Sequence, residues 1–491
     1  MGRGLRAERR GNVVSVSSMV VLAAALAVFR LGDESLWIDE AISVFVAWRD
    51  WPDLWTHVAH QEPNLGLYYF LLHAWIRLGD GEAAARALSA VAHVATVPVL
   101  FFLARRLFDR RVAVIASTLF AINAFAVAYA QEARPYAVAV LLATLCSLLF
   151  VRAVHEPSGR RWALYVLSAV LAVHAHVFAA FVLAGHAASL FILNRPDRQV
   201  RNASMAYSVV AILSAPLLWA VARSGTERIA WIDPPTIRDV FSVFTGLAGD
   251  GGPLLLLAYS GVCFLALIPA ARAWRETGTS ARTWRYAFLL AWLFVPVLLT
   301  LAVSAFKPVL IPRYLIVSLP ALMLIAGVGL AGLKGRWALA LLAVLAVFAL
   351  RALGILYGTD QKEQWRAATA MVLTASRDGD RIVLHTPSVA MPFAYYVLGT
   401  PGGADRAPRA VSPPVAWDES LTSVAPKKPL RNLLGLEERP PRVWLVLSHE
   451  DTNAETRRVA RSILDTLSAL YTRVGETRFI GIRVMLFDSA P

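Results

Sequence analysis

The chain has 491 residues, of which 57% are hydrophobic and 17% charged, and its mean hydropathy is +0.55. This composition excludes an ordinary soluble globular protein and indicates a polytopic membrane protein. The formal net charge of +14 would suit a nucleic-acid-binding protein, but the basic residues gather in short loops between apolar segments. That distribution is typical of membrane orientation, so we expect no nucleic-acid partner. Cys146 and Cys263 both fall inside apolar runs, which argues against a disulfide framework.

Apolar segments long enough to cross a bilayer, roughly 20 residues each, recur along the first 355 residues. The first follows several arginines and is long enough to span, so we interpret it as an uncleaved helix and not as a signal peptide. Residues 162–193 could be two short helices or one long tilted helix. Counting two, we expect about eleven spans, at residues 13–31, 85–104, 112–130, 136–152, 162–175, 177–193, 204–222, 253–271, 286–305, 314–332 and 337–355.

The basic loops decide between these two counts. With two helices in residues 162–193, every strongly basic short loop falls on the same side as the N-terminus, which the positive-inside rule assigns to the cytoplasm. One helix would reverse the second half of the chain and break this pattern. The external side then receives four loops, at residues 32–84, 131–135, 223–252 and 306–313. In the first of these, tryptophans among charged residues predict short helices in the membrane interface, and the apolar stretch 64–78 is too short to span.

After the last span the composition changes to that of a small soluble α/β domain, residues 356–491, which the topology places outside. Its length, roughly 130 residues, suffices for a core of its own. β-rich runs and helical periodicity predict its elements. The predicted strands are Arg381–His385, Arg442–Leu447 and Ile480–Phe487, the predicted helices are 360–376 and Asn453–Tyr471, and the Pro-rich stretch 401–429 is predicted as a surface loop.

An acidic pair, Asp39 and Glu40, follows the first span at the external edge of the bilayer. Adjacent carboxylates repel each other and are costly to desolvate, which favours a functional interpretation over a mere helix cap or a lipid contact. Glu62, just before Pro63, is a third candidate acid, although a charge at a helix N-terminus would explain it equally well. His57 and His60 lie close to Glu62, and such a pattern leaves a divalent metal open without indicating any firm cofactor.

Three external basic residues complete the candidate site. Arg134 lies in a very tight turn, where it could pair with Glu132 or the acidic pair, bind substrate, or do both. Lys307 and Arg313 depart from the positive-inside rule and precede an apolar helix. A basic pair there suggests an anionic lipid headgroup, since a guanidinium matches phosphate oxygens.

Four external motifs occur in order: Leu36–Ala41, Glu62–Asn64 with Leu67–Tyr69, Gln131–Ala137, and Pro312–Leu315. Together they resemble the bacterial GT-C glycosyltransferases of the protein-O-mannosyltransferase and aminoarabinose-transferase group, a glycosyltransferase family 39-like type. The resemblance covers residues 13–355, and Gln364–Arg366 with the later strands resembles the C-terminal extracytoplasmic domain of that group. Many members carry two prolines where this chain has Asn64-Leu65-Gly66, which leaves Glu62 less certain than Asp39.

The resemblance implies a bacterial inner-membrane enzyme that takes a sugar, hexosyl or pentosyl, from a polyprenyl-phosphate donor. The acceptor would be an extracytoplasmic glycan, lipid or protein, and membrane lipids would be further partners. In the family, an aspartate at the position of Asp39 acts as base or orients the acceptor. The residues so implied are Asp39, Glu40 and Glu62 as catalytic, Arg313, Lys307 and Arg134 at the donor phosphate, and Tyr68, Tyr69, Gln131, Tyr136, His176 and Tyr314 at the substrates.

The chemistry of the leaving group agrees with one base and several cations. A lipid-linked sugar phosphate leaves as an anion, so it needs no general acid, whereas a glycosidase keeps two carboxylates in order to protonate its leaving oxygen. One carboxylate acting on the acceptor hydroxyl, with a cation at the phosphate, suffices for inverting displacement. A transporter or lipid flippase is the alternative, but transporters place ionisable residues near the bilayer midplane. A catalytically silent scaffold is the third possibility.

Overall fold

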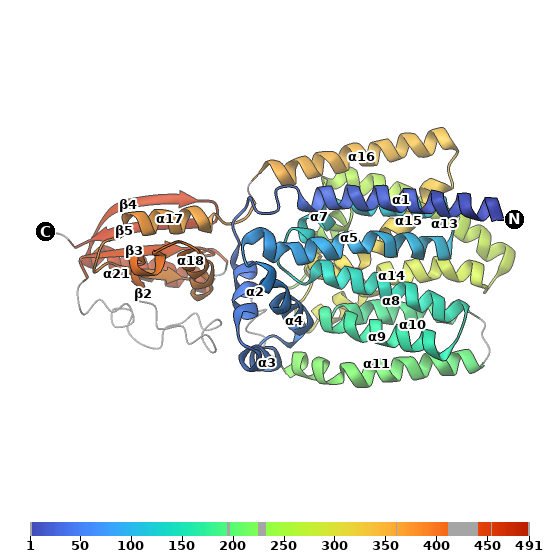
Figure 1. Ribbon diagram of the computed structural model, residues 1–491, viewed down its shortest axis with the longest axis horizontal. Coiled ribbons are helices and arrows are strands. Elements are labelled where there is room, and N and C mark those ends of the chain that lie inside the picture. The colour runs from blue at the N-terminus through green and yellow to red at the C-terminus, as the bar shows by residue number, and fades with distance from the viewer. Residues whose placement is uncertain are drawn as a thin grey trace.

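The computed structural model describes residues 2–193, 197–223, 232–359, 361–410, 440–452 and 454–489. A bundle of long helices forms one end of the molecule and a small α/β domain forms the other (Figure 1). The helices of the bundle are apolar and the domain contains a five-stranded sheet. The predicted fold class, a polytopic helical membrane protein with a C-terminal α/β domain, is therefore confirmed.

Within the described residues, eight helical segments are long and apolar enough to span a membrane. They are α1 (Gly2–Val28), α5 (Glu82–Leu107), α8 (Tyr136–His155), α11 (Asp197–Arg223), α13 (Gly252–Thr277), α14 (Ala281–Ser304), η5 with α15 (Pro312–Ser318 and Leu319–Ala331) and α16 (Gly335–Gly358). A ninth is possible if α6 (Arg110–Ala121) and α7 (Ala124–Ala130), which are bent by 59°, form one span. The bend occurs at Asn123, whose side chain accepts a hydrogen bond from the Ala126 N–H at 2.9 Å.

The predicted number of about eleven spans is thus higher than length and composition support in the described residues. If α6 and α7 count as one span, the difference lies in residues 162–193; if they do not, it also includes the predicted span 112–130. Residues 162–193 form two separate helices, as predicted, but α9 (Gly159–Ala175) has 17 residues and α10 (Ala179–Ser189) has 11, continued by η3 (Leu190–Ile192). Arg160 and Arg161 lie in the first turn of α9, so its apolar part is shorter still.

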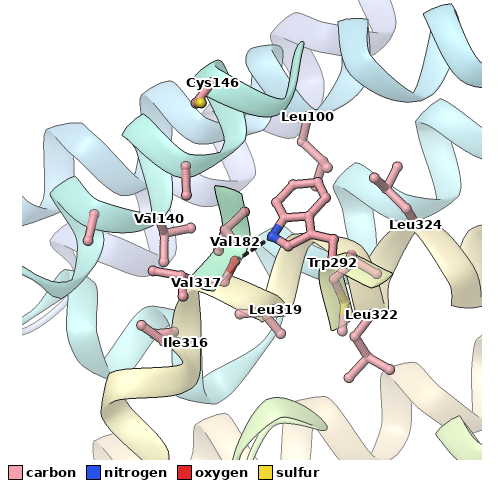
Figure 2. Packing of buried hydrophobic residues seen from close by; sticks show 14 of the residues in the cluster. Leu100, Val140, Cys146, Val182, Trp292, Ile316, Val317, Leu319, Leu322 and Leu324 are labelled. Carbon is pink, nitrogen blue, oxygen red and sulfur yellow. Dashed lines mark hydrogen bonds between the residues drawn. The ribbon is translucent and has the colours of Figure 1, made fainter. Parts of the chain in front are cut away.

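α15 lies at the centre of the bundle, and the apolar segment that it forms with η5, Pro312–Ala331, is 89% buried. Trp292 of α14 donates its indole N–H to the Val317 carbonyl of η5 at 2.9 Å, among side chains from α5, α8 and α10 (Figure 2). A Cβ on Gly329 would lie 2.0 Å from the Val262 carbonyl oxygen of α13. A small residue there lets the two backbones approach closely, as is common between membrane helices. This packing fixes the start of η5, where Arg313 lies.

The basic loops meet at the end of the bundle that lies away from the α/β domain. There Arg110 donates to the Ser15 hydroxyl at 2.8 Å, and Arg285 donates to the Leu107 carbonyl at 3.2 Å. The N-terminus lies at the same end (Figure 1). The loops that the positive-inside rule groups together are therefore neighbours in space, while their assignment to the cytoplasm stays a prediction.

Short helices of the first long loop lie at the opposite end, beside the α/β domain (Figure 1). They are α2 (Ile38–Trp48), α3 (Trp51–His60), η1 (Pro63–Leu65), α4 (Gly66–Trp75) and η2 (Ile76–Leu78), and α12 (Ile237–Leu247) lies in a later loop. α3 begins at Asp50, whose side chain accepts from the Asp53 N–H at 3.0 Å. Trp51 and Trp55 of α3 are 52% and 64% exposed, as suits an interfacial helix.

The sheet of the α/β domain has the strand order β2-β1-β3-β5-β4. β2 (Arg409–Ala410), β1 (Arg381–His385) and β3 (Arg442–Leu447) are parallel, and β5 (Ile482–Asp488) and β4 (Thr472–Phe479) run antiparallel to their neighbours. α17 (Trp365–Ala375) and α18 (Ala390–Leu398) cover one face, α21 (Ala454–Leu470) covers the other, and α19 (Gly403–Arg406) precedes β2. The three predicted strands are present. Of the predicted Pro-rich loop, residues 411–429 lie outside the described residues.

The α/β domain is attached directly to the first long loop. The Tyr395 ring stacks on Trp48 of α2 with 5.7 Å between centroids. The Tyr396 hydroxyl accepts from the Leu36 N–H at 2.7 Å and donates to Glu82 of α5 at 2.8 Å. The segment that carries the acidic pair is therefore held between the bundle and the domain.

Candidate active site

Asp39 lies in the first turn of α2, where the helix dipole favours a carboxylate. Its side chain is 27% exposed, and its Oδ2 is 3.5 Å from Nη2 of Arg134. Arg134 also donates to the Asp39 carbonyl and to the Ser43 hydroxyl, each at 3.3 Å. Of the partners considered for Arg134, the structure therefore gives it Asp39. The Asp39 carboxylate is held by a cation and still reaches solvent.

Glu40 has a different environment because it is fully buried. Arg86 of α5 donates two parallel hydrogen bonds to its oxygens, at 2.8 and 2.7 Å. The Ala133 N–H donates at 2.9 Å and Lys362 donates at 3.2 Å. Burial would raise the pKa of Glu40, but Arg86 and Lys362 lower that pKa from 4.5 to about 2. Glu40 is therefore an anion at neutral pH, and its oxygens are already engaged.

Arg86 and Lys362 were not among the predicted site residues. The remaining guanidinium donors of Arg86 bind the carbonyls of Leu31, Glu34 and Ser35 at 2.9–3.0 Å. Lys362, which follows the last span, also donates to the Gln131 carbonyl at 2.9 Å. Arg86 could have been found, because an arginine within an apolar helix is rare and functional by default. No local signal marks Lys362, which is 322 residues from Glu40.

Glu62 is tied to the start of α4. Its carboxylate accepts a hydrogen bond from the Tyr69 hydroxyl and lies 3.5 Å from Nε2 of His57. Burial would raise the pKa of Glu62, and hydrogen bonds from His57 and Tyr69 lower that pKa to about 2. The other histidine of the pair, His60, is hydrogen-bonded to the Thr56 carbonyl at 3.0 Å. Over the described ranges, no group of three or more His, Cys, Asp and Glu side chains could hold a metal ion.

Glu132 lies in the turn between α7 and α8, and its pKa is shifted in the opposite direction to those of Glu40 and Glu62. Burial raises the pKa of Glu132 to about 7, with Lys362 and Arg313 opposing the rise and Glu40 and Asp39 adding to it. Its Oε2 is buried and has no hydrogen-bond partner among the described residues, and the same holds for Nε1 of Trp37 and Nε of Arg134. Buried polar atoms in proteins nearly always have partners. Their concentration here is what a site for a polar substrate would show.

Aromatic rings surround Arg313 at the start of η5. Its guanidinium carbon is 6.0 Å from the centroid of the Trp37 ring and 5.8 Å from that of Tyr314. The Tyr314 ring is 5.4 Å from His176 and 6.4 Å from Tyr136, on which it stacks. Three of the predicted substrate-binding residues are therefore brought together around the predicted phosphate ligand.

The other predicted residues lie at the margins. Tyr68 and Tyr69 are fully buried in α4, with their ring centroids 6.3 Å apart. The amide of Gln131 is turned toward the end of α1, where it donates to carbonyls of residues 26, 27 and 29, so it joins α1 to the turn. Lys307 is half-buried just beyond α14, where its backbone N–H donates to the Val303 carbonyl at 2.9 Å.

The chain is similar to one protein family by sequence and to several solved structures by fold. The sequence profile of the dolichyl-phosphate-mannose-protein mannosyltransferase family matches residues 63–221. The chain is similar to ArnT from Cupriavidus metallidurans in the apo state, with 13% identity, 96% of this chain and 97% of that chain covered, and a TM-score of 0.62. ArnT bound to undecaprenyl phosphate gives a TM-score of 0.60 at 13% identity, with the same coverage.

A more distant solved structure is the oligosaccharyltransferase AglB from the archaeon Archaeoglobus fulgidus, in complex with an inhibitory peptide and a dolichol-phosphate. It shares 11% identity over 97% of this chain and 74% of that chain, with a TM-score of 0.53. No curated protein matches the chain by sequence.

The protein therefore has the fold of the GT-C membrane glycosyltransferases, and the resemblance seen in the motifs is confirmed. The matched family segment runs from η1 to the end of α11, and the structural likeness extends over nearly the whole chain. At 11–13% identity this likeness defines the fold and leaves the substrates to chemical argument.

Proposed function

We propose that the protein is a membrane glycosyltransferase that moves a sugar from a polyprenyl-phosphate donor to an extracytoplasmic acceptor by one inverting displacement. The observation that carries the proposal is the pairing of an accessible carboxylate, Asp39, with a cation, Arg134, beside the Arg313 cluster. The bound lipids in the two similar structures are undecaprenyl phosphate in ArnT and a dolichol-phosphate in AglB, and they support this class of donor.

Arg313 would bind the donor phosphate. A guanidinium can hold a phosphate with two parallel hydrogen bonds, and the flanking rings of Trp37 and Tyr314 restrict its orientation. Because the phosphate gains charge as the glycosidic bond breaks, a cation there stabilises the transition state more than the bound donor. Arg134, paired with Asp39, would add positive charge to the site, and Lys307 would add charge from the margin, just beyond α14. The phosphate leaves as an anion, so no acid is required.

Asp39 would take the proton of the acceptor hydroxyl while that oxygen attacks the sugar from the face opposite the phosphate. The Asp39 and Glu62 side chains are exposed to similar extents, 27% and 24%. The Glu62 carboxylate is engaged by the Tyr69 hydroxyl and by His57, whereas the Asp39 carboxylate is paired with the guanidinium of Arg134. Glu40, saturated by Arg86 and Lys362, would position α2 and hence its neighbour Asp39. Glu62 would fix α4 through Tyr69.

The positions of the charged groups disfavour a transporter or flippase. The charged groups of the site lie in the first turn of α2, the turn before α8 and the start of η5. Arg86 lies in the second turn of α5, again at one end of its helix. Transporters place such groups near the bilayer midplane.

The membrane orientation is part of the proposal, with the N-terminus in the cytoplasm and residues 356–491 outside a bacterial inner membrane. A reporter enzyme fused after Gly358, at the end of α16, should be active only in its exported form. A reporter fused after Leu333, in the loop before α16, is the matched control and should report the cytoplasm. A cytoplasmic signal at the first position would contradict the external active site.

Asp39→Asn tests the base. The change keeps the shape and removes the charge, so transfer should fall by about 10²–10⁴-fold while the protein stays folded. Asp465→Asn, on the exposed face of α21, is the control and should leave the rate unchanged. A variant at position 39 that retains more than about a tenth of the wild-type rate would exclude the base role.

Arg313→Ala and Arg313→Lys test the donor site in steady-state kinetics with a defined polyprenyl-phosphate sugar. Alanine should lower kcat and raise the donor KM strongly, and lysine should do so partially, because it offers a point charge in place of two parallel hydrogen bonds. Arg336→Ala, at the opposite membrane edge, is the control. Unchanged donor kinetics in a correctly inserted Arg313→Ala protein would exclude the phosphate-binding role of Arg313. Its side chain would then serve only to anchor η5 at the membrane interface.

A further inference from the structure

The α/β domain contains a polar cleft that the proposed mechanism does not use. It has a volume of about 440 Å³ and lies beyond the end of β3, between the loop 448–452 and the β4–β5 hairpin. This is within the usual range of small-molecule sites, about 300–1,000 Å³. The lining of the cleft comes from the carboxyl end of β3 and the loop that follows, and from the hairpin that joins the antiparallel strands β4 and β5.

Two buried donors line the cleft without a hydrogen-bond partner. The Ser448 hydroxyl and Nε of Arg483 both belong to lining residues, and neither atom has a partner among the described residues. Ser448 is only 2% exposed, and its backbone N–H is fixed on the His385 carbonyl at 3.0 Å. Buried polar atoms almost always have partners, so these two indicate a ligand that accepts hydrogen bonds.

The charges of the cleft favour a neutral ligand. Arg483 is paired with Glu450 at 2.7 Å, and Arg478 is paired with Glu476 at 3.1 Å. Asp451, which is paired with Arg457 at 2.9 Å, adds a further carboxylate to the lining. Because carboxylates already compensate the guanidinium groups, a phosphate or another anion would meet repulsion here. Hydroxyl groups can both donate to these carboxylates and accept from the two unpartnered donors.

The cleft is linked to the candidate active site by a short series of contacts. His449, which lines the cleft, is paired with Glu363, and this hydrogen bond together with the nearby charge of Asp39 raises the pKa of His449. Glu363 directly follows Lys362, whose ammonium binds Glu40. At the hairpin turn, a Cβ on Gly481 would lie 2.7 Å from Cγ of Glu363, so the rim of the cleft packs on the same segment.

We propose that this cleft is a subsite for the acceptor and that it binds a neutral, hydroxyl-rich glycan beside Asp39. The inference rests on the proposed function, because it makes the α/β domain the part that selects the acceptor. Ser448 and Arg483 would each donate a hydrogen bond to a glycan oxygen, and Glu450 would accept one from a hydroxyl. The exposed hydroxyl to be glycosylated would then extend past His449 toward the Asp39 carboxylate.

The test measures binding and turnover separately on the full-length protein in lipid nanodiscs. The probes are neutral methyl glycosides and short neutral oligosaccharides of mannose, galactose, glucose and arabinose, detected by saturation-transfer NMR. Ser448→Val and Arg483→Met should weaken binding about three- to tenfold each, as expected for one lost hydrogen bond. Ser462→Val and Arg461→Met, on the exposed face of α21, should bind like the wild type. Ser448→Ala, which adds no bulk, serves if the valine variant does not fold.

In kinetic assays the same cleft variants should raise the acceptor KM and leave the donor KM unchanged. Equal glycan binding by wild type and cleft variants would overturn the proposal, and so would a wild-type protein that binds none of the probes. Inorganic phosphate that competes for the cleft would make it an anion site, and a raised donor KM would assign it to the donor sugar. Cleft-dependent glycan binding in a protein that uses no polyprenyl-phosphate sugar would refute the transferase and leave a glycan-binding site.

Discussion

The Glu40–Arg86 pair should be the most sensitive point for stability in the external half of the molecule. Both side chains are at most 2% exposed, so solvent does not screen their interaction. Arg86→Met would leave the Glu40 carboxylate buried with only Lys362 and the Ala133 N–H as partners. Breaking a buried pair by removing one member typically costs about 3–5 kcal/mol. Lowering the pKa of Glu40 from 4.5 to about 2 corresponds to about 3 kcal/mol, which agrees in magnitude.

The double variant Arg86→Met/Glu40→Leu separates the free energy of the Arg86–Glu40 interaction from the contributions of the other contacts that Arg86 makes. It removes the uncompensated charge, so it should be at least about 2 kcal/mol more stable than Arg86→Met alone. Part of the loss should remain, because three carbonyls that Arg86 binds lose their donor. Arg282–Glu276, an exposed pair, is the control and should show a coupling below about 1 kcal/mol.

The assay is equilibrium unfolding of the purified protein in detergent, followed by tryptophan fluorescence. Because the pKa of Glu40 is lower in the folded state, its contribution is present above pH 4.5 and is lost as the pH falls toward about 2. Glu40→Gln should flatten this part of the pH profile. Additive effects of the two substitutions, or an Arg86→Met protein within about 0.5 kcal/mol of the wild type, would refute the assignment.

Two further substitutions test other parts of the structure by the same unfolding assay. Burial raises the pKa of Glu132 to about 7, so its contribution to stability is present below pH 4.5 and is lost as the pH rises through about 7. Glu132→Gln should therefore be more stable than the wild type at pH 8 and lack this pH dependence, and an identical pH profile would contradict the burial of this carboxyl. Gly329→Ala should destabilise by about 1–3 kcal/mol or more, because its methyl would overlap the Val262 carbonyl. Gly354→Ala, where a Cβ meets nothing within 4 Å, is the control, and equal stability of the two variants would contradict the close packing of α13 and α15.

The acidic pair illustrates how far sequence could identify the site. Two adjacent carboxylates at a membrane edge indicated a functional site, and the family motifs gave the same position. Sequence could not separate their environments, because successive residues of a helix point in different directions and the neighbours that fill those directions come from elsewhere. Arg86 lies 46 residues away and Lys362 lies 322 residues away, and together they bury Glu40 and leave Asp39 accessible.

In the α/β domain, the sequence predicted the buried strands and missed the exposed ones. β1, β3 and β5 lie in the interior of the sheet and are largely buried, so their apolar runs predicted them. β4 is an edge strand, mostly exposed, and interrupted by a register shift next to Gly475, so it carries neither alternation nor a continuous apolar run. β2 has only two residues, too few for any periodicity.

The contact between Lys362 and Glu40 sets the order in which this protein can be completed during biosynthesis. The two residues are 322 apart in sequence, which at about 5–20 residues per second corresponds to roughly 15–60 s of translation. During that interval the first long loop has emerged, yet Leu36 lacks its Tyr396 partner and Glu40 lacks Lys362. A chain that stops after its last membrane helix would therefore be inserted but unfinished. The contacts of Leu36 and Glu40 are thus complete only after residues of the α/β domain have been synthesised.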